Sequence, residues 1–184
     1  MAKTAYVFLA EGFEEVEALT PIDLLRRAGV EVTTVSVTGE RAVCGSHQIP
    51  VVADVLFEDM NYKGADLLVL PGGMPGTLKL KAHEGLTALL KDQYEYEKYI
   101  AAICAAPMVF GGLGFLKGRK ASIYPGMEEE LIGAEVSFDP VSVSDHVVTS
   151  RGVGTAIPFA LELIALLCGR EKADQIGKAI VYYI

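Results

Sequence analysis

The fold is decided by one stretch of the chain, Tyr99-Ile-Ala-Ala-Ile-Cys104-Ala-Ala-Pro107. Its first five residues are an apolar run of the length of a buried strand. Pro107 favours the start of a helix, because the N–H that proline lacks would have no partner there. The sequence therefore predicts a strand that passes directly into a helix, with the Cys104 thiol at the junction.

Small residues surround this thiol. Ala102 and Ala106 lie two positions to either side of Cys104, which is the spacing of a nucleophile elbow. A thiol at the start of a helix also faces unpaired N–H groups and the positive end of the helix dipole, and both favour the reactive thiolate. The alternative is that Cys104 is a small buried hydrophobic residue, as free cysteines often are.

Apolar runs alternate with helical patterns outward from this stretch. Further strands are predicted at residues 4–10, 31–37, 48–53, 66–70 and 147–150, and helices at residues 14–28, 83–93, 107 onward, 154–168 and 171–178. Because the strands are apolar and are separated by helices, they predict an α/β fold with a mostly parallel sheet and helices on both faces. Residues 135–138 and 141–144 are expected to form a hairpin appended to this sheet, and residues 1–184 a single domain.

Composition excludes several classes of protein. The formal charge of −8 and the absence of a Lys/Arg cluster exclude nucleic acid as a partner. No apolar stretch approaches the ~20 residues that cross a bilayer, and acidic residues follow the first apolar run too closely for a signal peptide. Cys44, Cys104 and Cys168 form an odd set without paired spacing, which indicates a reducing compartment. We therefore expect a cytoplasmic protein without a membrane partner.

Candidate site residues follow three of the predicted strands. In an open α/β sheet, ligands bind beyond the carboxyl ends of the strands, and Cys104, Gly72-Gly73 and Glu11-Gly12 all lie at such ends. In one interpretation the two glycines only make a tight turn out of the sheet. In the other, their amides approach a substrate oxygen and the Ala105 amide completes an oxyanion hole.

Glu17 is the candidate proton donor and acceptor. It shares an apolar helical face with Phe13 and Pro21. Burial there would raise its pKa and keep it protonated, and a protonated carboxyl can donate a hydrogen bond to a thiolate. The alternative is a capping glutamate in a helix that bends at Pro21. For Glu14 and Glu15, favourable pairing with the helix N-terminus is a sufficient explanation.

No histidine is favoured as a catalytic base. His83 is expected at the start of a helix and His146 in a polar turn, and both are expected to be solvated. Cys44 and His47 have the spacing of half a metal site, but no second pair completes it, so zinc is rejected. We expect neither a metal nor a cofactor. Cys168, near a helix end, is expected in the core.

Six motifs occur in a fixed order along the chain: Leu9–Glu17, Pro21 with Asp23, Arg26–Gly29, Val69–Gly73, Ala101–Ala105 and Thr149–Thr155. Together they resemble the ThiJ/PfpI superfamily, and specifically its DJ-one branch. The match is nearly collinear from Ala5 to about Val181. It implies a flavodoxin-like three-layer sandwich and a homodimer to whose interface the first helix contributes.

The resemblance also implies a site. Cys104 is its reactive cysteine, held by a protonated Glu17. The amides of Gly73 and Ala105, with Gly72 beside them, would bind an oxyanion or an oxidised sulfur.

The pocket of this site would be lined by Tyr124, Gly152 and Val153. Tyr124 stands where well-known relatives place a histidine near the thiol. Because phenols ionise only near pH ~10, proton transfer would fall to Glu17 or to water. His47 stands where relatives carry an arginine that reaches across the dimer.

Two functional hypotheses follow, because the resemblance implies glyoxalase-type conversion of methylglyoxal to lactate, protein deglycation, peroxide sensing and chaperone activity. The first, placed slightly ahead, is an enzyme acting on small 2-oxoaldehydes or glycated substrates. Cys104 attacks the aldehyde and Glu17 moves a proton between adjacent carbons. The second is a redox-responsive protective or chaperone-like protein in which Cys104 becomes a sulfinate. A PfpI-type protease is excluded, since such proteases carry histidine directly after the cysteine, where this chain has Ala105.

Overall fold

The structure is a computed structural model that describes residues 2–182. Its main sheet has seven strands, and every neighbouring pair is parallel except the first. In spatial order these strands are β10 (Val141–Ser144), β11 (Val147–Ser150), β7 (Tyr99–Ile103), β6 (Leu67–Leu70), β1 (Thr4–Leu9), β2 (Glu31–Ser36) and β5 (Val55–Leu56). Two small sheets pair β3 (Ala42–Cys44) with β4 (Pro50–Val52), and β8 (Lys120–Ala121) with β9 (Glu135–Val136).

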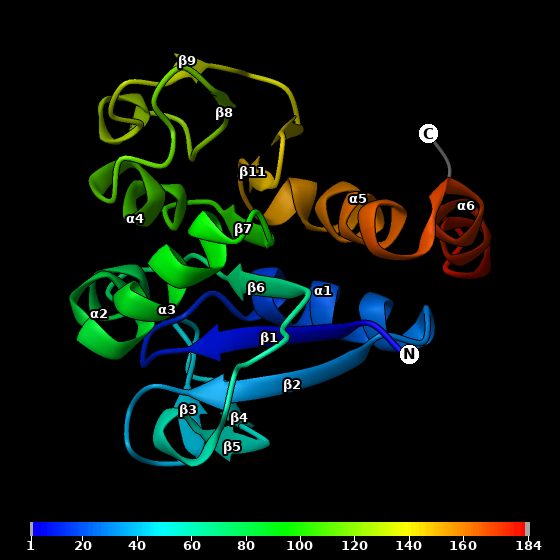
Figure 1. The fold of residues 1–184 in the computed structure, drawn as a ribbon. Coiled ribbons are helices and arrows are strands. Elements are labelled where there is room, and N and C mark those ends of the chain that lie inside the picture. The colour runs from blue at the N-terminus through cyan, green and yellow to red at the C-terminus, as the bar shows by residue number, and fades with distance from the viewer. Residues whose placement is uncertain (1, 183–184) are drawn as a thin grey trace.

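Helices cover both faces of the main sheet (Figure 1). One face carries α1 (Glu15–Arg27), α5 (Ala156–Cys168) and α6 (Arg170–Ala179), and the other carries α2 (Gly76–Ala82), α3 (Glu84–Glu95) and α4 (Pro107–Gly112). Short 3-10 helices occupy Phe57–Asp59, Glu128–Glu130 and Val153–Thr155. Among these helices, none combines the length and the apolar character that crossing a bilayer requires.

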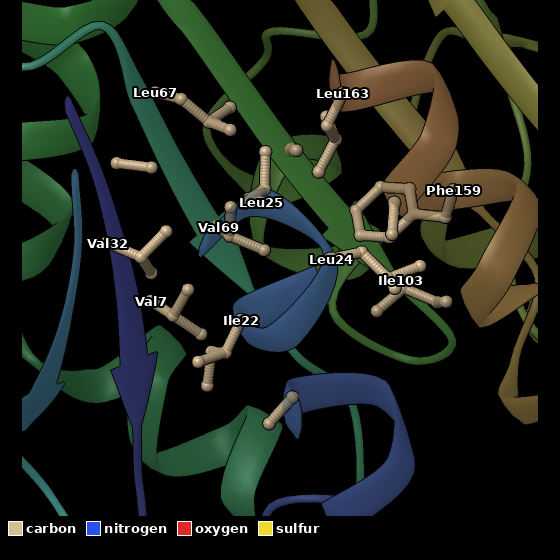
Figure 2. Packing of buried hydrophobic residues seen from close by; sticks show 14 of the residues in the cluster. Val7, Ile22, Leu24, Leu25, Val32, Leu67, Val69, Ile103, Phe159 and Leu163 are labelled. Carbon is tan, nitrogen blue, oxygen red and sulfur yellow. The ribbon is translucent and has the colours of Figure 1, made fainter. Parts of the chain in front are cut away.

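Alternate residues of the central strands contribute to two hydrophobic cores, one on each face of the sheet. In β7, Ala101 and Ile103 belong to the core formed with α1 and α5, whereas Ile100 and Ala102 belong to the core formed with α3 and α4. Figure 2 shows the first core, which also contains Phe159 of α5. The three-layer α/β fold is thus confirmed, because apolar strands without polar alternation need cover on both sides.

The stretch that decided the fold forms the elements predicted for it. β7 spans Tyr99–Ile103, and α4 begins at Pro107. β11 also has its predicted bounds, whereas α2 was not predicted as a helix of its own. Only seven residues long, α2 lies directly before α3, and its sequence is too short to show a helical period of its own.

The predicted hairpin between residues 135–138 and 141–144 is wrong. β10 instead forms the hairpin with β11, through a two-residue turn at Asp145-His146 in which Asp145 has φ +54°. β9 pairs in parallel with β8 in a separate two-stranded sheet. An aspartate tolerates positive φ, so Asp145 itself was the turn signal that the sequence offered.

Four neighbouring strands, β11, β7, β6 and β1, bring their carboxyl ends to one edge of the sheet. The loops that follow β1 and β6 meet there through their backbones. Glu14 N donates to the carbonyl of Gly72 at 2.9 Å, and Gly76 N donates to that of Gly12 at 3.3 Å. A side chain at Gly12 would place its Cβ 2.6 Å from Pro75 Cδ, so this close approach requires glycine. The edge is therefore a fixed platform for the residues that follow these strands.

Candidate active site

Cys104 lies immediately after β7 in a strained backbone conformation. Its φ is +63°, in the left-handed region that non-glycine residues rarely adopt. Two backbone hydrogen bonds hold it there: Cys104 N donates to Ser150 O at 3.1 Å, and Cys104 O accepts from Tyr124 N at 2.9 Å. This conformation is the one that a nucleophile elbow needs to turn the side chain out of the sheet.

Two backbone amides face the sulfur of Cys104, those of Gly73 and Ala105. The amide of Gly72, which the sequence placed with them, has a different partner, since it donates to Glu17 Oε2 at 3.1 Å. Side chains could not fit at either glycine. A Cβ at Gly72 would lie 2.5 Å from Cys104 Cβ, and a Cβ at Gly73 would lie 2.4 Å from Glu14 N. The two glycines therefore allow the loop after β6 to lie close to Cys104 and Glu14, and they also form the turn.

Glu17 projects from the first turns of α1 and is fully buried. While Gly72 binds Oε2, Oε1 has no hydrogen-bond partner among the described residues. Burial, together with the negative charge of Glu14, raises the pKa of Glu17 to about 7, against the opposing effects of the Cys104 thiol and the Gly72 amide. The carboxyl therefore gains and loses its proton near neutral pH.

The pKa of Cys104 corrects a sequence prediction. The helix start was expected to lower it, whereas burial and the neighbouring Glu17 carboxylate raise it to about 12. The amides of Gly73 and Ala105 act in the opposite direction but do not outweigh these effects. With α4 only six residues long, little helix dipole is available. At neutral pH Cys104 is therefore a thiol, and the neighbouring Glu17 carboxylate is placed to accept its proton.

A cleft of about 480 Å³ opens over the thiol. The structure brings together here all three pocket residues expected from the sequence: Tyr124, Gly152 and Val153 line the cleft with Cys104 and Glu17. The backbone at Gly152 lies close to the side chains of Tyr124 and Glu17. A Cβ there would be 3.5 Å from Tyr124 Cδ2 and 3.8 Å from Glu17 Oε1.

Several side chains of this cleft were not assigned to it from the sequence, among them Glu14, Phe138 and Arg151. A signal for Arg151 was available, because it directly follows the strand predicted at residues 147–150 and so lies at the carboxyl edge of the sheet. Phe138 had no such signal. It belongs to the segment whose pairing was wrongly predicted.

Glu14 and Glu15 have separate structural roles. Glu14 caps α1 as expected, accepting from Glu17 N at 2.8 Å. Glu15, also expected only to favour the helix start, is buried and binds the loop after β3, accepting from His47 N at 2.7 Å and contacting His47 Nδ1 at 2.9 Å. Although burial opposes it, these hydrogen bonds and one from Ile49 N lower the pKa of Glu15 to about 2.

The same three side chains form the one group of potential metal ligands found among residues 2–182. Ligand atoms of Glu14, Glu15 and His47 lie within 4.8 Å of one another. Both carboxylates already accept hydrogen bonds from the protein, so the group is explained as a loop anchor.

The other histidines and cysteines lie outside the cleft. His83 Nδ1 caps α3 by accepting from Leu86 N at 3.0 Å. His146 occupies the turn at the opposite end of β11, with its ring against Tyr94. Cys168 is exposed rather than in the core, because it is the last residue of α5 and faces away from the sheet.

Comparisons with known proteins agree with this fold and show the family. Residues 3–166 match the model of the DJ-1/PfpI family. Protein DJ-1 homolog A of Arabidopsis thaliana is 40% identical over 97% of this chain, which spans only 46% of that relative. The glutathione-independent glyoxalase DJR-1.2 of Caenorhabditis elegans is 34% identical over 97% of this chain and 96% of its own length. The solved structure of Toxoplasma gondii DJ-1, described as oxidized, superposes with a TM-score of 0.96 at 38% identity and covers both chains completely.

The raised pKa of Glu17 predicts how stability depends on pH. Its folded-state pKa of about 7 exceeds the unfolded value of 4.5, so the folded protein binds the proton more tightly. The stabilisation is complete below the unfolded pKa and is lost as pH rises to about 7, a change of about 3 kcal/mol in the free energy of unfolding. Glu17→Gln should remove this slope, as measured by urea denaturation at a series of pH values.

Glu15→Gln is the matched control for this experiment. Because the pKa of Glu15 is lowered to about 2, its contribution is present above the unfolded pKa of 4.5 and is lost only in stronger acid. Glu15→Gln should therefore destabilise at neutral pH and leave the slope between the unfolded pKa and neutrality intact. A Glu17→Gln variant with the wild-type slope would contradict the assignment.

Proposed function

Because the chain belongs to the DJ-1/PfpI family, we propose that it is a cysteine-dependent enzyme that converts small 2-oxoaldehydes such as methylglyoxal to 2-hydroxy acids. The observation that carries this proposal is the fully buried carboxyl of Glu17, with a pKa near 7, in contact with the Cys104 thiol. A general acid–base group is most effective when its pKa lies near the working pH. The name of the C. elegans relative supports the same reaction class.

In the first step, the sulfur of Cys104 attacks the aldehyde carbon of methylglyoxal. The Glu17 carboxylate accepts the thiol proton as the C–S bond forms, so no free thiolate is needed. The aldehyde oxygen takes up negative charge, which the Gly73 and Ala105 amides stabilise, and it then receives the proton from Glu17. The product of this step is a hemithioacetal.

In the second step, Glu17 removes the proton from the carbon bonded to sulfur and returns it to the adjacent carbonyl carbon, while the hydroxyl proton of the hemithioacetal passes to the oxygen of that carbonyl. This transfer converts the hemithioacetal to a thioester of lactate. Water then hydrolyses the thioester, releasing lactate and regenerating the thiol. The sum is methylglyoxal plus water giving lactic acid, with no cofactor. A deglycase reaction on glycated substrates would use the same thiol and carboxyl.

Substitution of the two reacting groups tests this proposal. Cys104→Ala should abolish lactate formation from methylglyoxal, and Glu17→Gln should lower kcat by about 10²- to 10⁴-fold, the usual contribution of a general base. Because Glu17 must be ionised in the free enzyme, kcat/KM should rise with pH through about 7. Cys44→Ala, outside the cleft, is the control and should keep wild-type turnover. Lactate production by the Cys104→Ala variant would contradict the mechanism.

A second candidate function is supported by the two amides at the sulfur and by the oxidized state of the T. gondii structure. In this alternative, peroxide oxidises Cys104 after Glu17 has accepted the thiol proton. One peroxide gives the sulfenic acid and water, and a second gives the sulfinic acid and water. The amides of Gly73 and Ala105 would bind sulfinate oxygens, and the protein would serve a protective or chaperone-like role.

Peroxide titration distinguishes this candidate. Cys104 should gain two oxygen atoms before half-buried Cys44 or exposed Cys168 is modified, as read by mass spectrometry of the three peptides. Glu17→Gln should slow the oxidation at least tenfold, because the variant lacks the general base that accepts the thiol proton. Equal modification of all three cysteines would exclude a dedicated sensor.

A homodimer formed through α1 is the proposed assembly. Val16 and Leu19, three residues apart on this helix, are 45% and 40% exposed, which leaves an apolar strip available to a partner. The opposite face of the helix, which includes Ala18, Ile22 and Leu25, is buried against the sheet and α5.

Sedimentation equilibrium tests this assembly. The wild type should give twice the chain mass of 19.7 kDa, and the double variant Val16→Asp with Leu19→Asp should give the chain mass itself. Tyr96→Asp, at a more exposed position after α3, should remain dimeric. A double variant that is still dimeric would place the interface elsewhere.

A further inference from the structure

The cleft contains a cation that the proposed reaction leaves without a role. Arg151 follows the last residue of β11 and lines the same cleft as Cys104 and Glu17. Its backbone N–H donates to Thr155 Oγ1 at 3.2 Å, as does that of Gly152 at 3.1 Å. The backbone that carries the side chain is therefore fixed at the edge of the cleft.

The guanidinium group is held by an aromatic ring rather than by an acid. Its central carbon lies 5.6 Å from the centroid of Phe138, and one Nη1 hydrogen bond reaches Phe138 O at 3.5 Å. Nε is buried without a hydrogen-bond partner, and within residues 2–182 no carboxylate forms an ion pair with Arg151. Arg170 differs in this respect, because it pairs with both oxygens of Glu162. Most donors of Arg151 are thus available to a ligand.

The acids around Arg151 are engaged with other groups. Glu14 caps α1, and Glu17 Oε2 is bound by the Gly72 amide. The carboxylate of Glu128 accepts from Gly126 N at 2.9 and 3.1 Å at the surface. A guanidinium with a planar array of free donors matches the two oxygens of a carboxylate.

We propose that Arg151 is the carboxylate-recognising residue of the Cys104 cleft, so that the cleft binds small 2-hydroxy and 2-oxo acids. The contact with Phe138 positions the guanidinium, while among residues 2–182 a single hydrogen bond, to Phe138 O, engages its donors. A carboxylate bound there lies in the cleft that also holds the thiol and the free Oε1 of Glu17.

This inference deepens the proposed function and rests on it for the identity of the product. Conversion of an uncharged 2-oxoaldehyde creates a carboxylate only when the thioester is hydrolysed. Arg151 would therefore bind the product and not the substrate, and lactate would inhibit by competing for the cleft. The same charge would favour any reagent that brings a carboxylate to Cys104.

The experiment compares alkylation of Cys104 by iodoacetate, which carries a carboxylate, and by neutral iodoacetamide. Rates are read from the Cys104 peptide by mass spectrometry, so the measurement needs no turnover. Arg151→Gln should lower the ratio of the iodoacetate rate to the iodoacetamide rate about tenfold, as expected for loss of a steering charge in a cleft. Arg151→Lys should keep most of the ratio. Arg170→Gln, whose charge lies outside this cleft, should keep all of it.

The outcomes separate this proposal from the enzymatic one. An unchanged ratio in Arg151→Gln would overturn carboxylate recognition, whether or not the wild type converts methylglyoxal. A lowered ratio with an unchanged iodoacetamide rate supports it and shows that the cleft is intact. Lactate should also protect Cys104 from iodoacetamide in the wild type, with about tenfold weaker protection in Arg151→Gln. Equal protection in the two proteins would again overturn the inference, even if turnover is present.

Discussion

The carboxyl of Glu17 lies beneath the ends of β6 and β7, out of contact with solvent, and its two oxygens have different surroundings. Oε2 is fixed by the Gly72 amide, which ties α1 to the loop after β6. Oε1 has no partner among the described residues and lies close to Gly152 at the edge of the cleft. A buried carboxyl with one satisfied and one free oxygen is costly unless it is protonated or meets a ligand. The remainder of the site is arranged around this constraint.

The proton balance of the site follows from the same burial. Burial raises the pKa values of both Glu17 and Cys104, and the Glu17 carboxylate raises that of the thiol further, whereas the thiol lowers that of Glu17. Glu17 titrates first, near neutral pH, while the thiol keeps its proton. A thiol paired with a base whose pKa is near 7 reacts by handing over its proton during attack, which is the role that we propose for Glu17.

The acids of α1 illustrate how neighbouring residues of one type acquire different properties. Glu14 caps the helix, Glu15 is held ionised by the His47 loop, and Glu17 is held close to its neutral form by burial. The sequence shows only that the three are acidic and lie near a helix start. His47 is bound to Glu15 of its own chain. The cationic side chain that lines the cleft is Arg151, from the loop after β11.

Local sequence determined the elements and indicated the candidate site residues. The apolar run from Tyr99 to Ile103 and Pro107 defined a strand and a helix start, and the motif order led to the DJ-1/PfpI family that the comparisons establish. Burial of Glu17 was also predictable, because its place on an apolar helix face follows from helical periodicity alone. Only the tertiary structure decided the pairing of β10 with β11, the partner of the Gly72 amide and the direction of the pKa shift of Cys104. Each of these depends on how closely groups distant in sequence approach one another, and electrostatic and hydrogen-bond energies change steeply with that distance.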